Sequence, residues 1–363
     1  MSEPVMWRTQ IGHAAIALRK PMLRVHSPMA KALSLCGALS VMLLVGLPQQ
    51  AQAETASSEV QSVVSAKAQH SLLVDIANLG SRLVAVGDRG HILYSDDNGS
   101  SWTQAQVPTR QLLTAVYFVD DRYGWAVGHD AQILASTDGG VTWSKQFEDL
   151  ELEAPLLDVW FKDRSTGFAV GAYGALLSTT DGGANWESVS DLMDNEDAYH
   201  LNAITEIAGQ GLFVVGEQGV MFRSPDYGQT WEALESPYEG SLFGVLDAGE
   251  PGAMLVYGLR GHLFRSADFG TTWQRIALKR ENNGALEFGL ANGSKLADGS
   301  IVIVGHGGTI LRSTDKGRSF TVQNRPDRLS LAGVAADGKG RLIFVGQGGV
   351  QFSAPTETSR GQQ

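Results

Sequence analysis

Residues 124–143 read GWAVGHDAQILASTDGGVTW, and this stretch decides the fold because it recurs along the chain. A short apolar run ends at Gly128, a second apolar run follows it, and a box from Ser136 to Trp143 completes the stretch. Glycines that end equivalent runs follow one another at intervals of 41–47 residues, at Gly87, Gly128, Gly171, Gly216, Gly258, Gly305 and Gly346. Because self-similarity at such a period indicates a repeat architecture, the chain holds seven copies of one unit.

Six of the seven units contain the same box, Ser/Thr-x-Asp-x-Gly-x-x-aromatic, eight residues after the first glycine. Its acids and aromatics are Asp97 and Trp102, Asp138 and Trp143, Asp181 and Trp186, Asp226 and Trp231, Asp268 and Trp273, and Asp315 and Phe320. A repeated acid suggests catalysis, but aspartate also accepts backbone N–H bonds in a turn where glycine supplies positive φ. We therefore predict that the boxes are structural hairpins and that their aromatics pack between units.

Each unit reads as four short strands separated by turn residues. In the second unit these are residues 112–118, 124–127, 132–135 and 142–146. Four strands at this period are typical of a β-propeller blade, so we predict an all-β, seven-bladed propeller of four-stranded antiparallel blades over residues 71–355. The seventh unit lacks a box, and residues 54–70 precede the first unit. Ser58–Gln69, with three valines, is expected to close the ring as the outermost strand of the last blade.

The second and third units share a further motif, in which Phe118, Asp120, Gly124 and Trp125 recur as Phe161, Asp163, Gly167 and Phe168. With the boxes, this motif resembles the photosystem II stability/assembly factor family of BNR/Asp-box propellers. The resemblance implies an exported, non-catalytic scaffold that binds protein and assists assembly or stability of a membrane protein complex. Sialidases share the box, so a glycan-active or glycan-binding protein of sialidase or endoglucanase type is the alternative.

The N-terminus resembles a secretory signal. Basic residues precede an apolar run over residues 32–47, and Ala51-Gln52-Ala53 follows as a cleavage site. We expect residues 1–53 to be removed and the protein to reach the periplasm or an equivalent compartment, without stable lipid insertion; an uncleaved anchor is the alternative. Removal takes five of the 28 basic and one of the 39 acidic residues, which leaves 23 against 38 and changes the net charge from −11 to −15.

That charge excludes a nucleic-acid partner, since phosphate-binding surfaces need an excess of lysine and arginine. The one cysteine, Cys36, lies within the predicted signal, so no disulfide is expected. Residues 356–363 form a polar tail. We expect a monomer that binds a protein partner and has no cofactor, no metal and no catalytic residue.

Binding is expected on the face that carries the turns between second and third strands, because these turns vary most between units. The candidate residues in these turns are Asp88, Arg89, His129, Asp130, Tyr173, Glu217, Arg260 and His306. Two long connections on the same face add the acids Glu151 and Glu153, and Asp194 and Asp197. These acids are interpreted as a solvated charge run, a docking surface for a basic segment, or a calcium site near residues 191–197.

Overall fold

The computed structural model describes residues 60–152, 154–278 and 286–353. In these ranges the chain forms seven antiparallel sheets, six of four strands and one of three. Within every sheet the strands lie side by side in chain order.

The seven sheets follow one another along the chain as blades. Blade 1 contains β1 (Leu73–Asn78), β2 (Leu83–Gly87), β3 (Ile92–Ser95) and β4 (Thr103–Gln104). Blade 2 contains β5 (Leu113–Phe118), β6 (Gly124–Gly128), β7 (Ile133–Ser136) and β8 (Ser144–Phe147). Blade 3 contains β9 (Leu156–Phe161), β10 (Gly167–Gly171), β11 (Leu176–Thr179) and β12 (Glu187–Ser188). Blade 4 contains β13 (Leu201–Ile207), β14 (Gly211–Gly216), β15 (Met221–Ser224) and β16 (Glu232–Ala233).

The remaining blades repeat the pattern. Blade 5 contains β17 (Leu242–Asp247), β18 (Met254–Gly258), β19 (Leu263–Ser266) and β20 (Gln274–Arg275). Blade 6 contains β21 (Leu290–Lys295), β22 (Ile301–Gly305), β23 (Thr309–Ser313) and β24 (Thr321–Asn324). Blade 7 contains β25 (Leu331–Ala336), β26 (Leu342–Gly346) and β27 (Gln351–Phe352). The short 3₁₀ helices are η1 (Ala68–His70), η2 (Asp88–Gly90), η3 (Ala172–Gly174), η4 (Ser190–Leu192), η5 (Glu217–Gly219), η6 (Leu259–Gly261) and η7 (His306–Gly308).

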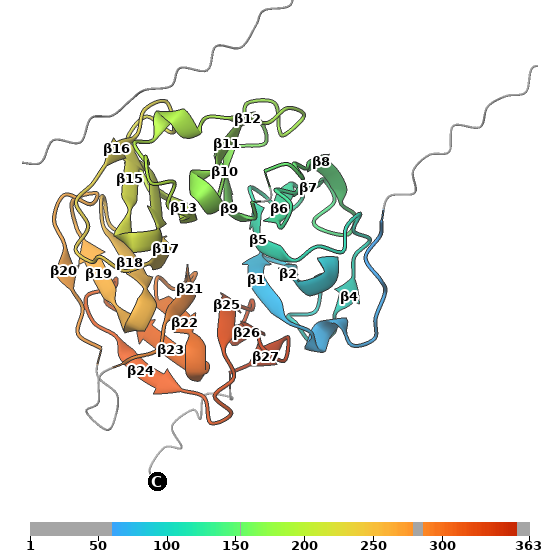
Figure 1. The fold of residues 1–363 in the computed structure, drawn as a ribbon. Helices are drawn as coiled ribbons and strands as arrows, with labels where there is room; N and C mark the ends of the chain where they lie inside the picture. The colour runs from blue at the N-terminus through green and yellow to red at the C-terminus, as the bar shows by residue number, and fades with distance from the viewer. Residues whose placement is uncertain (1–59, 153, 279–285, 354–363) are drawn as a thin grey trace, which may run out of the picture. The chain divides into compact units, whose positions relative to one another are not determined.

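The first strands of the blades form the inside of a closed ring (Figure 1). Each packs against the first strand of the next blade, and β25 of blade 7 packs against β1 of blade 1. The predicted fold, a seven-bladed β-propeller, is confirmed.

The second strand of every blade is buried along its whole length. Because neighbouring blades cover both of its faces, its sequence is a continuous apolar run such as GWAVG or IVIVG. Each run ends at the repeated glycine. The residue after that glycine donates its N–H to the carbonyl that precedes the first strand, at 2.8–3.0 Å in all seven blades.

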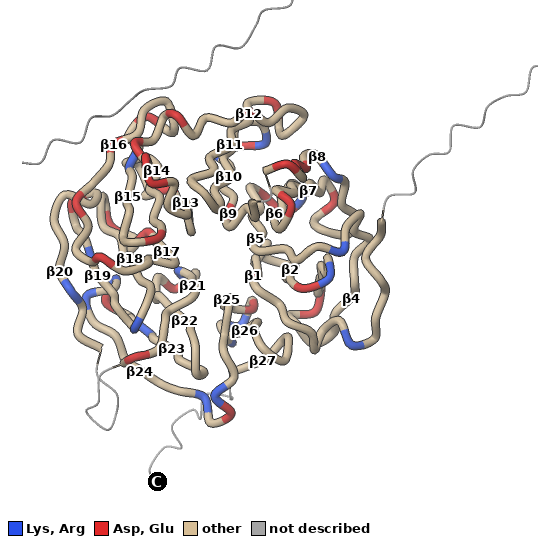
Figure 2. The backbone as a smooth tube through the Cα atoms, viewed as in Figure 1, with Lys and Arg blue, Asp and Glu red and all other residues tan. Residues whose placement is uncertain are grey.

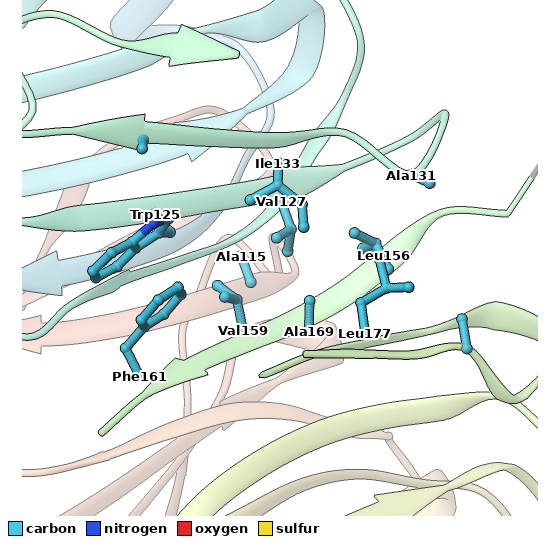
Figure 3. Close-up of a cluster of buried hydrophobic side chains, with 12 residues drawn as sticks. Ala115, Trp125, Val127, Ala131, Ile133, Leu156, Val159, Phe161, Ala169 and Leu177 are labelled. Atoms are coloured by element: carbon cyan, nitrogen blue, oxygen red, sulfur yellow. The ribbon is translucent and has the colours of Figure 1, made fainter. Parts of the chain in front are cut away.

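Seven apolar clusters lie between neighbouring blades, one at each interface around the ring. Figure 3 shows the cluster between blades 2 and 3, where the rings of Trp125 and Phe161 stack with centroids 3.4 Å apart. Each box aromatic packs in one of these clusters, namely Trp102, Trp143, Trp186, Trp231, Trp273 and Phe320. The stability of the ring therefore depends on the contacts between blades.

The predicted closing strand is wrong for the part of Ser58–Gln69 that the structure describes. From Val60 onward the segment follows blade 1: the Ser62 N–H donates to the Val107 carbonyl at 2.8 Å. Its one backbone hydrogen bond to blade 7 runs from the Val350 N–H to the Gln69 carbonyl. Two physical reasons explain the error. The valines bury little surface, since Val64 is 83% exposed, and β27 offers only two residues for pairing.

The stability of the blade interfaces can be tested at Trp143, which is 7% exposed and packs edge-on against Phe118. Trp143→Ala removes a buried aromatic and should lower the free energy of unfolding by about 3–5 kcal/mol. Urea unfolding measures this change. Tyr173→Ala is the matched control: its ring is 63% exposed, so it should change stability by less than about 0.5 kcal/mol. A loss below about 1 kcal/mol in Trp143→Ala would contradict the packing role.

Candidate functional site

The strand order assigns the loops to two faces of the propeller. The box hairpins, from residues 95–102 to residues 313–320, lie on one face, which we call the box face. The opposite face carries the connections between blades and the turns between second and third strands, and we call it the turn face. Its turns are residues 88–90, 129–131, 172–174, 217–219, 259–261, 306–308 and 347–349.

On the box face each aspartate is hydrogen-bonded within its own turn. Asp97 Oδ1 accepts hydrogen bonds from Ser95 Oγ and from the Ser101 N–H, both at 2.8 Å, and Oδ2 accepts one from the Ser101 hydroxyl at 2.6 Å. The bond from the Ser101 hydroxyl and the two others lower the pKa of Asp97 to about 2. The Ser/Thr-to-Asp bond measures 2.7–3.0 Å in all six boxes. The six carboxylates are therefore held in their turns rather than presented to a ligand.

The turn face presents a different side chain from each blade. The middle residue of each turn has a left-handed backbone, with φ between 53° and 62° in six blades, at Arg89, Asp130, Tyr173, Gln218, Arg260 and Gly307. Five of these six are not glycine, although this conformation favours glycine. Among the other predicted residues, His129 and His306 are exposed, and Asp88 and Glu217 are half-buried.

The acidic connections join blade 2 to blade 3 and blade 3 to blade 4, and the strand order places both on the turn face. Figure 2 shows acidic positions in red around these blades. Between β8 and β9, the exposed Glu151 donates its N–H to Asp149 Oδ1. Between β12 and β13, the side chains of Asp194 and Asp197 are exposed. Glu153 lies outside the described residues. Within residues 60–152, 154–278 and 286–353, no group of three or more His, Cys, Asp or Glu side chains is placed to hold a metal ion.

A groove of about 710 Å³ opens beside the blade 2 turn. Val60, Pro108 and Leu150 give it an apolar wall, and Asp130 lines it too. Gln132 lies at its base, 3% exposed, and donates Nε2–H to Glu148 at 2.6 Å. Its Oε1 has no hydrogen-bond partner among the described residues, so the groove contains a buried acceptor without a donor.

A second cavity, of about 460 Å³, follows the propeller axis and is lined by the first strands of all seven blades. Each first strand has a β-bulge near its start. The residues just after the bulges are Asp75, Ala115, Asp158, Ala203, Gly244, Asn292 and Gly333. Two carboxylates and one amide thus share a ring of otherwise small residues.

The two carboxylates accept hydrogen bonds from the backbone of the next blade. Asp75 Oδ2 accepts from the Val116 N–H at 3.0 Å, and Asp158 Oδ2 accepts from the Ile204 N–H at 2.9 Å. Burial raises the pKa of the Asp75 carboxyl. Burial, together with the charge of Asp75, raises the pKa of Asp158 to about 7. Tyr117 and Tyr257 are the other ionisable groups that interact with Asp158, and both pKa values are raised.

Sequence reasoning missed this axial cavity. The signal was present, because its ring residues precede the repeated glycines by 12–14 positions in every unit. However, the bulge inserts one extra residue into each first strand and shifts its register. The alternation of inward and outward side chains along the sequence therefore does not show which of them face the axis. The groove was missed for another reason: it depends on where residues 60–65 run, and that path was predicted wrongly.

The family described as "Photosynthesis system II assembly factor YCF48" matches residues 95–151 and 146–287. The chloroplastic photosystem II stability/assembly factor HCF136 of Cyanidioschyzon merolae is 35% identical over 85 residues, which cover 22% of this chain and 20% of that protein. The photosystem II assembly protein Ycf48 of Synechococcus sp. (strain JA-2-3B'a(2-13)) is 32% identical over 145 residues, which cover 36% and 40%.

These matches span less than half the length of either curated relative. Among solved structures, one of YCF48 bound to D1 peptide has a TM-score of 0.61 with 17% identity, covering 78% of this chain and 91% of that one. At that identity the similarity concerns the fold alone.

In the described ranges, no helix has the length and apolar composition needed to cross a membrane.

The raised pKa of Asp158 predicts a pH dependence of stability. In the unfolded chain the pKa of this carboxyl should be near 3.8, whereas in the folded protein it is about 7. Between pH 3.8 and about pH 7, Asp158 is therefore protonated in the folded protein and ionised in the unfolded chain. This contribution to stability is lost as pH rises through that window. Asp158→Asn cannot titrate, and its melting temperature should therefore fall less than that of the wild type between about pH 5 and about pH 8.

Differential scanning calorimetry at both pH values measures the difference. Asp191→Asn, at an exposed position on the turn face, is the matched control and should follow the wild type. Identical pH dependence in Asp158→Asn and the wild type would show that Asp158 is ionised in the folded protein.

Proposed function

The chain belongs to the photosynthesis system II assembly factor YCF48 family, and on that basis we propose that it is an exported, non-catalytic scaffold that helps a membrane protein complex to assemble. It acts as a monomer and binds an extended segment of a client protein on its turn face. The structure of a related propeller, named as YCF48 bound to D1 peptide, supports a peptide as the kind of ligand.

The observation that carries this proposal is the backbone of the turn face. Arg89, Asp130, Tyr173, Gln218 and Arg260 adopt positive φ where glycine would cost less. A non-glycine residue in this conformation costs on the order of 1 kcal/mol or more, and such costs concentrate at functional positions. On the box face Asn98, Tyr227, Phe269 and Lys316 also have positive φ, but each lies inside a box. The hydrogen bonds of the box aspartate stabilise that turn, as in the box of Asp97.

The groove beside blade 2 is the part of the turn face best suited to a peptide. Val60, Pro108 and Leu150 form its apolar wall. Because Leu150 is exposed in the free protein, apolar side chains of a client could pack against it. The unpartnered Gln132 Oε1 would accept a hydrogen bond from the peptide backbone. Buried acceptors without donors are costly, so a peptide N–H at this point would add to binding.

The family and the arrangement of the acids support the non-catalytic part of the proposal. The six box aspartates are held in their turns, and the two acids of the axial ring, Asp75 and Asp158, accept backbone hydrogen bonds from the next blade. The turn face combines side chains of both charges, such as Arg89 and Asp130. The exported location rests on the signal-like N-terminus, whose residues 1–53 lie outside the described part of the chain.

Affinity capture from the native envelope tests the proposal. The tagged full chain should retain a membrane protein. Asp130→Ala/Leu150→Ala/Tyr173→Ala should reduce its recovery at least about five-fold, since it removes two exposed side chains and the half-buried Asp130 that lines the groove. Quantitative mass spectrometry of the captured proteins is the measurement. The matched control, Asp121→Ala/Gln229→Ala, changes exposed residues on the box face and should retain the client.

Two results would contradict the proposal. One is equal loss of the client in the control variant, which would move binding to the box face or make it nonspecific. The other is turnover of a panel of fluorogenic glycosides by the purified protein, which would assign it to the glycan-active class.

A further inference from the structure

The axial cavity holds negative groups without positive ones. Asp75 and Asp158 line it, and no lysine or arginine appears among its lining residues. Both residues are half-buried. Two alanines at equivalent ring positions, Ala115 and Ala203, also line the cavity, and their small side chains leave space within it.

An independent feature is the hydroxyl of Tyr257. Tyr257 pairs with Gly244 in the sheet, and a side chain at Gly244 would meet the tyrosine ring and hydroxyl, so the phenol crosses the glycine toward the axis. The residue is 2% exposed and lines the cavity. Among the described residues its hydroxyl has no hydrogen-bond partner. A buried phenol normally finds one, so this hydroxyl lacks a partner that a ligand would supply.

The acids also have unused capacity. Each oxygen of Asp158 accepts one backbone N–H, from Val159 at 2.8 Å and from Ile204 at 2.9 Å. A carboxylate oxygen can accept two hydrogen bonds, so Asp158 can accept further donors from inside the cavity. Asn202 lines the same space, and its Nδ2 donates to the Leu242 carbonyl at 2.8 Å, which leaves Oδ1 as an acceptor.

From these acceptors we propose that the axial cavity binds a single organic cation, an alkylammonium or guanidinium head group. Such a cation carries several N–H donors that match the oxygens of Asp75, Asp158 and Tyr257, and its charge compensates two carboxylates that the protein alone leaves unpaired with any base. The ring of Phe243, which also lines the cavity, adds a face for cation–π contact.

A metal ion fits this site less well. Calcium takes six to eight oxygen ligands at short range, whereas the described residues form no group of three acids or histidines that could hold an ion. A volume of about 460 Å³ is instead within the range of small-molecule sites. The cation could come from a free amine or from a lysine or arginine side chain of a client, and binding measurements distinguish these sources.

Isothermal titration calorimetry of the full chain tests the site. The probes are n-butylammonium, N-methylguanidinium, and capped Gly-Lys-Gly and Gly-Arg-Gly, with capped Gly-Gln-Gly as the neutral control. We expect saturable heat from the cationic probes, none from the neutral peptide, and tighter binding at about pH 8 than at about pH 6, as ionised Asp158 attracts the cation. Tighter binding of the peptides would assign the head group to a client side chain, and tighter binding of the free cations to a soluble amine.

Three variants make the test specific. Asp158→Asn should weaken binding at least about ten-fold, and Tyr257→Phe, which keeps the ring and the packing, should weaken it about three-fold or more. Asp191→Asn on the turn face should bind as the wild type does. Melting temperatures confirm that each variant is folded.

Absence of heat from every cationic probe with the folded wild type would overturn the proposal, and so would unchanged affinity in both cavity variants. Calcium binding that Asp158→Asn abolishes, without binding of organic cations, would replace it with a metal site. None of these results depends on capture of a client, so the cavity and the proposed function fail separately.

Discussion

One close backbone approach is repeated in every blade, and the rest of the propeller depends on it. Where the second strand ends, a side chain on the repeated glycine would overlap the carbonyl oxygen that precedes the first strand; in blade 2 these are Gly128 and Leu112. The next residue donates its N–H to that same oxygen. The requirement is steric, since the glycine of blade 3, Gly171, has an extended backbone with φ of −165° that any residue adopts.

This approach determines where the functional surfaces lie. The contact holds the start of each first strand next to the turn that follows the second strand. The start of the first strand and this turn therefore lie on the same face, the turn face. The bulge comes two residues into the first strand, and it directs Asp75 and Asp158 toward the axis near that face. The position of the exposed turn residues and of the axial cavity therefore depends on one repeated contact, whereas the groove also needs the path of the chain from Val60. The boxes stabilise the opposite face through local hydrogen bonds.

Much of the fold could be predicted because its determinants are local and repeated. The strands of blade 2 lie within two residues of their predicted positions, since apolar runs between turn residues specify them. The path of Val60 to Gln69 could not be predicted in this way, because it depends on which edge of the closed ring offers free hydrogen-bonding groups. The hydrogen-bond partner of Asp158 could not be predicted either, because the Ile204 N–H belongs to the next blade, 46 residues away.

The measurement that tests this account most directly is the unfolding free energy of Gly128→Ala. The added methyl group would overlap the Leu112 carbonyl, and we expect a loss of about 1–3 kcal/mol or more in urea unfolding. Gly289→Ala is the matched control, because the nearest atoms to its new methyl group would lie 3.7 Å away, and it should unfold as the wild type does. Equal stability of Gly128→Ala and Gly289→Ala would contradict the claim that this backbone approach holds the blades.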